Sequence, residues 1–241
     1  MKVLAGGCRV YAPEEGQVSI LGNRTTRAVI NPQSGAKRIT QAVSDYRPGI
    51  SEPVMNPSAE EVLYVAAGGA DCVVAGIQYH LRPGAAVYIP PGAPYNIDNA
   101  GPATLRVISS CCPVLASKTG SPAMVHEDDR EEIRAGQDRI FRYLVHTDLG
   151  CQQVTQFVGW IPTSKAPFHM HTYEEVIFIL EGRGILHLEG QLAASEFNPG
   201  TSIYLPDGVV HCLENPGPAP IRLLGVFHPS GSPGAAYETE D

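Results

Sequence analysis

The sequence predicts an all-β protein built from two tandem copies of one fold, and three observations lead to this prediction. The chain has 25 glycines and 21 prolines in 241 residues, a content that suits short strands joined by tight turns better than long helices. Short runs such as EVLYVAAG and EVIFILEG are rich in β-branched and aromatic residues and end at glycine, which is typical of strands. The third observation is an internal repeat.

The repeat is visible in two stretches of each copy. EEVLYVAAGGA begins at Glu60 and EEVIFILEGRG begins at Glu174, an offset of 114 residues. RPGAAVYIPPGAPYNIDNAGPATLRVI, residues 82–108, matches NPGTSIYLPDGVVHCLENPGPAPIRLL, residues 198–224, at an offset of 116. Because the identities fall in nearly one frame over most of each copy, they indicate two copies of one fold.

The extent of the repeat sets the expected domain boundaries. We expect the first copy at 1–112, a linker at 113–139 and the second copy at 140–241. Helical periodicity is weak except in the charged segment 126–138, HEDDREEIRAGQD. This segment could form a short helix between the copies or a solvated linker, and we assign no chemistry to it.

Charge and cysteine content restrict the class of protein. The formal net charge of −8 argues against nucleic acid and anionic membranes as partners, because both attract basic surfaces. No run approaches the roughly 18 apolar residues that a membrane span needs. The six cysteines are scattered without a CxxC pair, so we expect free thiols and a cytoplasmic protein.

A candidate metal site lies in the segment PFHMHTYEEVIFILEGRG. On a strand, His169 and His171 project to the same side, with Cα atoms about 6.6 Å apart. Glu175 would lie about 13 Å from His171 along a straight strand, so the chain must fold back near residues 172–174 for both to bind one ion. Glu175 is a better ligand than Glu174, because it aligns with Glu61 of the first copy and directly adjoins the apolar strand. His211, which follows the turn at 206–208, is the natural fourth ligand.

These residues resemble the two motifs of the cupin superfamily. The first motif, glycine, HxH, then glutamate and glycine, matches Gly159 to Gly182, and the second, Gly-x5-Pro-x-Gly-x2-His-x3-Asn, matches Gly200 to Asn215. The resemblance implies a bicupin, with two small β-barrels of the jelly-roll type in one chain. It also implies that His169, His171, Glu175 and His211 bind a metal, since they occupy the metal-binding positions of cupins.

The first copy lacks most of this ligand set. Met55, Pro57 and Tyr95 stand at the histidine positions, and Glu61 is the one ligand position retained. Methionine and proline do not replace imidazole on a hard or borderline divalent ion. We therefore expect a metal-free first barrel with a structural or dimerising role.

The ligand set suits one divalent transition metal, Fe, Mn, Ni or Zn. We expect a metal-dependent enzyme acting on a small oxygen-bearing metabolite, with dioxygenase as the first choice. The alternatives are a non-oxidative lyase, isomerase or decarboxylase, a hydrolase similar to the bicupin ureidoglycine aminohydrolase, or a non-enzymatic small-molecule binding cupin. Family habit suggests a homodimer.

Three further residues are candidates for catalysis beside the metal. His187, in GILHLEG, could point into the barrel as an acid or base, or outward to solvent. Tyr173 and Glu174 occupy the expected turn next to the ligands and could gate the pocket, although exposed turn residues are common.

Overall fold

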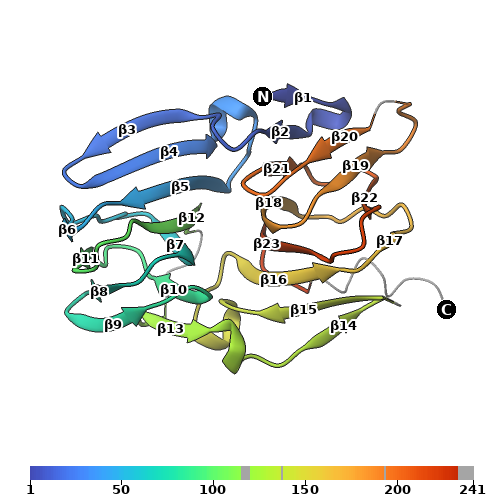
Figure 1. The fold of residues 1–241 in the computed structure, drawn as a ribbon. Coiled ribbons are helices and arrows are strands. Elements are labelled where there is room, and N and C mark those ends of the chain that lie inside the picture. The colour runs from blue at the N-terminus through green and yellow to red at the C-terminus, as the bar shows by residue number, and fades with distance from the viewer. Residues whose placement is uncertain (115–119, 137, 193, 233–241) are drawn as a thin grey trace.

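The structure, a computed structural model, describes residues 1–114, 120–136, 138–192 and 194–232. It confirms an all-β protein with two antiparallel barrels side by side (Figure 1). In each barrel a large sheet faces a small four-stranded sheet. No helix in the described part of the chain is long and apolar enough to cross a membrane.

The first barrel contains most strands of the N-terminal half. Its large sheet has, in spatial order, β13 (Ala123–His126), β10 (Ala85–Ile89), β7 (Ala59–Ala67), β12 (Leu105–Pro113), β5 (Thr40–Tyr46), β4 (Arg24–Ile30) and β3 (Gln17–Leu21). Its small sheet has β6 (Gly49–Ile50), β11 (Tyr95–Asn99), β8 (Ala70–Val74) and β9 (Ile77–Leu81). Among the described residues, the single-turn 3-10 helices are η1 (Ala5–Gly7), η2 (Pro32–Ser34), η3 (Glu127–Asp129) and η4 (Thr147–Leu149).

The second barrel repeats this plan. Its large sheet has β1 (Lys2–Val3), β2 (Arg9–Tyr11), β21 (Ser202–Leu205), β18 (Glu174–Glu181), β23 (Ile221–His228), β16 (Thr155–Ile161), β15 (Arg139–Tyr143) and β14 (Ile133–Ala135). Its small sheet has β17 (Ser164–Lys165), β22 (His211–Asn215), β19 (Gly184–Leu188) and β20 (Ser195–Phe197). The strand order therefore matches that of the first barrel from β2 to β14.

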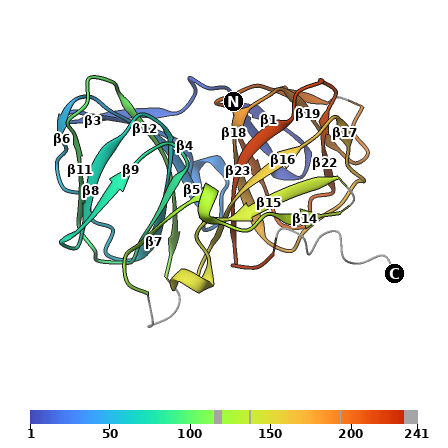
Figure 2. The same ribbon diagram turned by 60° about the horizontal axis from the view of Figure 1, so that its bottom comes forward.

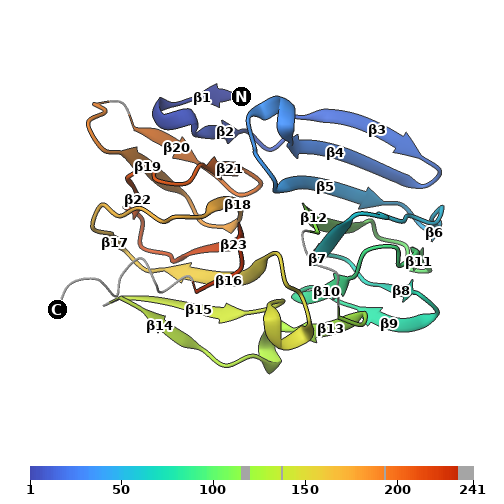
Figure 3. The same ribbon diagram turned by 180° about the vertical axis from the view of Figure 1, so that it is seen from behind.

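The two barrels exchange their edge strands, which differs from the expected boundaries. β2, expected in the first copy, pairs with β21 of the second barrel, and Figure 3 shows it beside the orange strands. β13, expected in the linker, pairs with β10 of the first barrel. The charged segment 126–138 forms no α-helix in its described residues, because η3 is a single turn and β14 is a strand of the second barrel.

Apolar side chains form three cores. One lies inside each barrel, and a third joins the two barrels where their large sheets face each other (Figure 2). The shared core includes Val62 and Tyr64 from β7 and Val176 and Phe178 from β18. Alternate residues of a strand face opposite sides of the sheet. β7 and β18 therefore each contribute side chains both to the interior of their own barrel and to the shared core.

The double glutamates follow the same alternation. Glu174 faces the neighbouring barrel, and its carboxylate accepts hydrogen bonds from the backbone N–H groups of residues 37–39 in that barrel and from the hydroxyl of Tyr204 on the adjacent strand β21. Glu60 does the same in the opposite direction, since it accepts from the N–H groups of residues 152–153 and from the Tyr88 hydroxyl. These reciprocal contacts hold the two barrels in register.

Candidate metal centre

The four predicted ligands lie at one end of the second barrel. His169 and His171 belong to an extended segment before β18, where His169 forms an isolated bridge with His211 rather than part of a longer ladder. The backbone N–H of each residue in this bridge donates to the carbonyl of the other, at 3.0 and 2.9 Å. The chain bends at residues 172–173 and enters β18 at Glu174, so the predicted reversal brings Glu175 back toward the histidines.

The backbone fixes the protonation side of all three imidazoles. The Nδ1 atoms of His169, His171 and His211 lie 3.1, 2.8 and 2.9 Å from the carbonyl oxygens of Pro167, Tyr173 and Val209. A carbonyl oxygen only accepts, so Nδ1 carries the hydrogen in each neutral ring and Nε2 keeps the lone pair. Such second hydrogen bonds are typical of metal-binding histidines.

The carboxylate of Glu175 approaches the imidazole of His171. Glu175 Oε2 lies 3.2 Å from His171 Nε2, which is buried and has no hydrogen-bond donor to satisfy its lone pair. Candidate ligand atoms of His171, Glu175 and His211 lie within 4.8 Å of one another. Two ligands about 2.1 Å from one ion are at most about 4.2 Å apart, so binding an ion needs only a small contraction.

The fourth predicted ligand lies beside this group rather than within it. The ring centroid of His169 is 4.6 Å from that of His211. His171, Glu175 and His211 offer three buried, convergent acceptor groups, and His169 lines the same pocket beside them. The residues therefore fit a divalent cation, which would satisfy the acceptors that face one another.

The electrostatic setting keeps two of the imidazoles neutral. Burial lowers the pKa of His211 to about 3, and repulsion from His169 adds to this effect. Burial also lowers the pKa of His169. Burial opposes the charged form of His171 too, but the adjacent Glu175 carboxylate outweighs it and raises the pKa of this imidazole.

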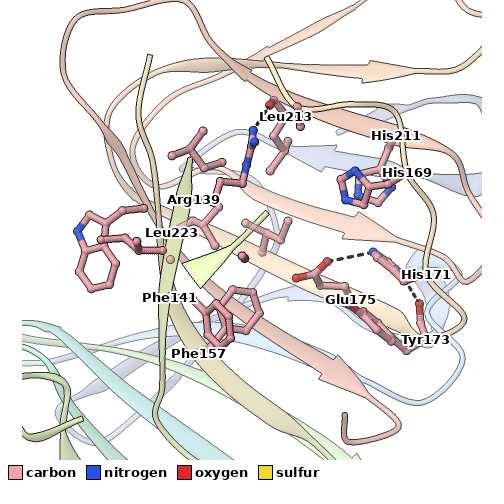
Figure 4. Close-up of a pocket in the computed structure, with 17 residues that line it drawn as sticks. Arg139, Phe141, Phe157, His169, His171, Tyr173, Glu175, His211, Leu213 and Leu223 are labelled. Atoms are coloured by element: carbon pink, nitrogen blue, oxygen red, sulfur yellow. Dashed lines mark hydrogen bonds and ion pairs between the residues drawn. The ribbon is translucent and has the colours of Figure 1, made fainter. Parts of the chain in front are cut away.

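The ligands line a pocket inside the second barrel (Figure 4). Its volume is about 80 Å³, several times the roughly 10–15 Å³ that one water molecule needs. The wall opposite the ligands is mainly apolar, with Phe141, Phe157, Ile161 and Leu223. The pocket thus suits a small metabolite with an apolar part.

Of the three candidates for catalysis, Tyr173 alone lines the pocket. Its ring stacks on His171 with centroids 4.1 Å apart and on Phe227 at 4.2 Å. Glu174 is not an exposed turn residue, because it is the buried first residue of β18 and contacts the first barrel. His187 faces outward on β19, where its Nε2 lies 2.6 Å from the Glu214 carboxylate.

The sequence analysis missed Arg139, which is buried and lines the same pocket. Arg139 is the first residue of β15, as Arg24 is the first residue of β4 in the first barrel. No cupin motif includes this position, and the residue lay in the expected linker. The repeated arginine at matching strand starts is the signal that could have identified it.

Comparisons with known proteins agree with this architecture. A family model described as Cupin domain matches residues 42–111 and 157–227, more than half of the chain. An uncharacterized protein of Methanocaldococcus jannaschii is 39% identical over 67 residues, which cover 27% of this chain and 52% of that protein. This chain thus spans about half the length of that curated relative.

Two solved structures share the fold over nearly the whole chain. A putative glyoxylate induced protein from Pseudomonas aeruginosa has a TM-score of 0.81 at 20% identity, covering 94% of this chain and 91% of that one. Oxalate decarboxylase from Bacillus subtilis has a TM-score of 0.76 at 13% identity, covering 92% and 78%. The family matches, one in each barrel, show that the chain belongs to the cupin family and is a bicupin.

Proposed function

We propose that this bicupin is a metal-dependent enzyme that oxygenates a small oxygen-bearing metabolite in the pocket of its second barrel. The observation that carries the proposal is the arrangement of acceptors at the pocket floor. Three imidazoles direct Nδ1 at backbone carbonyls and so leave Nε2 as the atom that would bind an ion, and candidate ligand atoms of His171 and His211 lie within 4.8 Å of the Glu175 carboxylate. A divalent cation would satisfy these buried acceptors, which otherwise face one another.

The proposed ligands are His169, His171, Glu175 and His211, and they suit Fe, Mn, Ni or Zn. A related fold supports a divalent ion, because oxalate decarboxylase from Bacillus subtilis is described with Mn(II) centres. When bound, such an ion supplies Lewis acidity and, for a redox-active metal, a site for dioxygen chemistry. One carboxylate leaves a net charge of +1 on a divalent site, which favours an anionic or enolic oxygen on the substrate.

The pocket favours oxygenation because it offers few groups for proton transfer. Among the described lining residues, the ionisable side chains besides the four proposed ligands are Arg139 and Tyr173. Glu174 and His187 lie outside the pocket, so neither can move a proton to a bound substrate. The apolar wall excludes water from the reacting end of the substrate, which suits chemistry with dioxygen.

A non-oxidative lyase, isomerase, decarboxylase or hydrolase is the second candidate. Tyr173 is the observation that favours it, since its phenol stands beside His171 at the edge of the pocket. In that reaction the Tyr173 hydroxyl would deliver the proton at the end of the substrate nearest the ligands.

Metal analysis followed by oxygen measurement tests the proposal. We expect about one divalent metal per chain in the protein as purified, and oxygen uptake that depends on one member of a panel of enolisable acids and diketones. Turnover without oxygen uptake would favour the second candidate. Bound metal without turnover of any tested compound would favour a binding protein, and absence of a metal would contradict the enzyme proposal.

A further inference from the structure

The pocket holds a buried cation that the proposed metal site does not use. Arg139 is 8% exposed, and its guanidinium has two hydrogen bonds, from Nη2 to the Leu213 carbonyl at 3.0 Å and from Nη1 to Asp138 at 3.1 Å. These contacts use two of the five N–H groups of the guanidinium. The Asp138 side chain is 38% exposed, so solvent screens its attraction for the arginine.

The first barrel shows how such an arginine is neutralised from within. Arg24, at the matching strand start, contacts the Tyr46 hydroxyl and attracts the buried carboxylate of Glu61. In the second barrel the equivalent carboxylate, Glu175, faces His171 instead. Arg139 therefore borders a pocket in which a ligand can take the place that Glu61 fills in the first barrel.

We propose that Arg139 is the carboxylate-binding residue of the pocket, so that the substrate is a small organic acid with an apolar body. Arginine pairs with carboxylates through two parallel N–H···O bonds, a geometry that lysine does not reproduce. Figure 4 shows Arg139 and Leu223 on one side of the pocket and the imidazoles on the other. An acid bound at Arg139 would lay its body against Phe141 and direct its far end toward the proposed ligands.

The inference rests on the proposed function only for the reaction at the end of the substrate that lies nearest the proposed metal ligands. Binding of the acid depends on Arg139 and the apolar wall, and neither requires a metal. The substrate class is therefore an aromatic or branched aliphatic acid whose far end bears a hydroxyl, keto or enolic oxygen.

Isothermal titration calorimetry of metal-free protein can test this inference independently of turnover, because it measures binding of a ligand directly. The probes are 4-hydroxyphenylacetate and its methyl ester, which share an apolar body with a hydroxyl at the far end and differ in charge. We expect the dissociation constant of the acid to be at least about tenfold lower than that of the ester, equivalent to about 1.4 kcal/mol.

Variants of Arg139 then assign the preference to this residue. Arg139→Gln should remove the preference for the acid, whereas Arg139→Lys should retain part of it. Arg134→Gln is the matched control, because it removes the same charge from an exposed position on the neighbouring strand β14 and should leave the preference unchanged.

Three results would overturn the inference. They are equal binding of acid and ester by the wild-type protein, absence of measurable binding of the acid, and a folded Arg139→Gln variant that keeps the preference. If Arg139→Gln fails to fold, Arg139→Lys and the wild-type comparison decide. Since no metal is present, each result is separate from failure of the proposed oxygenation.

Discussion

The two barrels of this chain share one scaffold but fill their interiors differently. In the first barrel, Tyr95 stands where the second has His211, and its hydroxyl donates to Glu61 at 3.1 Å. In the second barrel, the equivalent Glu175 lies 3.2 Å from His171 Nε2 and borders a pocket. The inward glutamate therefore accepts a hydrogen bond from a tyrosine in the first barrel and belongs to a candidate metal centre in the second.

This difference shows which parts of the repeat belong to the scaffold. The outward glutamates, Glu60 and Glu174, have matching contacts in both barrels and therefore serve the fold. The inward glutamates are also repeated, so a glutamate at this position does not by itself indicate a metal. The histidines occur in one copy alone, which assigns the proposed chemistry to His169, His171 and His211.

The largest expected effect concerns the histidines. His171→Ala should lower metal affinity by at least about 100-fold, because it removes a ligand rather than a group that merely orients one. Metal content per chain, measured by elemental analysis after dialysis, checks this. His187→Ala is the matched control, since His187 faces Glu214 outside the pocket and its removal should leave metal content unchanged. Equal metal content in the two variants would refute the site.

The next effect separates the two glutamates of each pair. Glu174→Gln should lower the free energy of unfolding by about 3–5 kcal/mol while metal content stays constant, because the amide NH₂ would face backbone N–H donors of the first barrel. Glu175→Gln should have the opposite pattern: it should reduce metal content and change the free energy of unfolding less than Glu174→Gln does. Urea denaturation and elemental analysis of both variants distinguish these outcomes.

The same experiment on the first barrel tests the symmetry of the contacts. Glu60→Gln should destabilise the protein by a similar amount, since Glu60 accepts bonds from residues 152–153 of the second barrel. If Glu60→Gln left the free energy of unfolding unchanged while Glu174→Gln lowered it, the two sets of contacts between the barrels would not contribute equally to stability.

The sequence predicted the fold and pointed to the residues that the structure gathers at the candidate metal centre, because both leave local signals. The repeat, the glycine-terminated strands and the HxH spacing are all visible within short windows. The exchange of β2 and β13 was not visible, because these short edge strands pair with residues far away in the chain. Strand alternation could have shown that Glu174 and Glu175 face opposite sides, but only the tertiary structure shows that a second barrel lies beyond Glu174. Arg139 was missed because it carries no motif.

The buried Glu61 predicts a smaller, pH-dependent effect. Burial raises the pKa of Glu61 from 4.5 to about 7, so between these values the folded protein binds more protons than the unfolded chain. Stability from this group is therefore present in full below about pH 4.5 and is lost as pH rises through about 7, with a total change on the order of 3 kcal/mol. Glu61→Gln should flatten the stability profile over this window. Unfolding curves of both proteins from pH 4.5 to 8 provide the test, and identical slopes would contradict it.

The smallest effect concerns a residue that makes room for the pocket wall. A Cβ atom at Gly225 would lie 2.2 Å from Phe157 Cζ and 3.1 Å from Glu175 Oε1, so Gly225→Ala must displace the aromatic ring. Overpacking of this kind costs about 1–3 kcal/mol of unfolding free energy. In the first barrel the equivalent pair is Ser109 and Ala42, where a small residue replaces the ring and a side chain is accommodated.

Ser109→Ala is accordingly the matched control and should change stability by no more than about 0.5 kcal/mol. Urea denaturation measures both variants, and metal content per chain reports whether the displaced Phe157 ring alters the proposed site. If Gly225→Ala were as neutral as Ser109→Ala, the Phe157 ring would not depend on the missing side chain. The pairing of Phe157 with Gly225, in place of Ala42 with Ser109, would then not contribute to the difference in stability between the two barrel interiors.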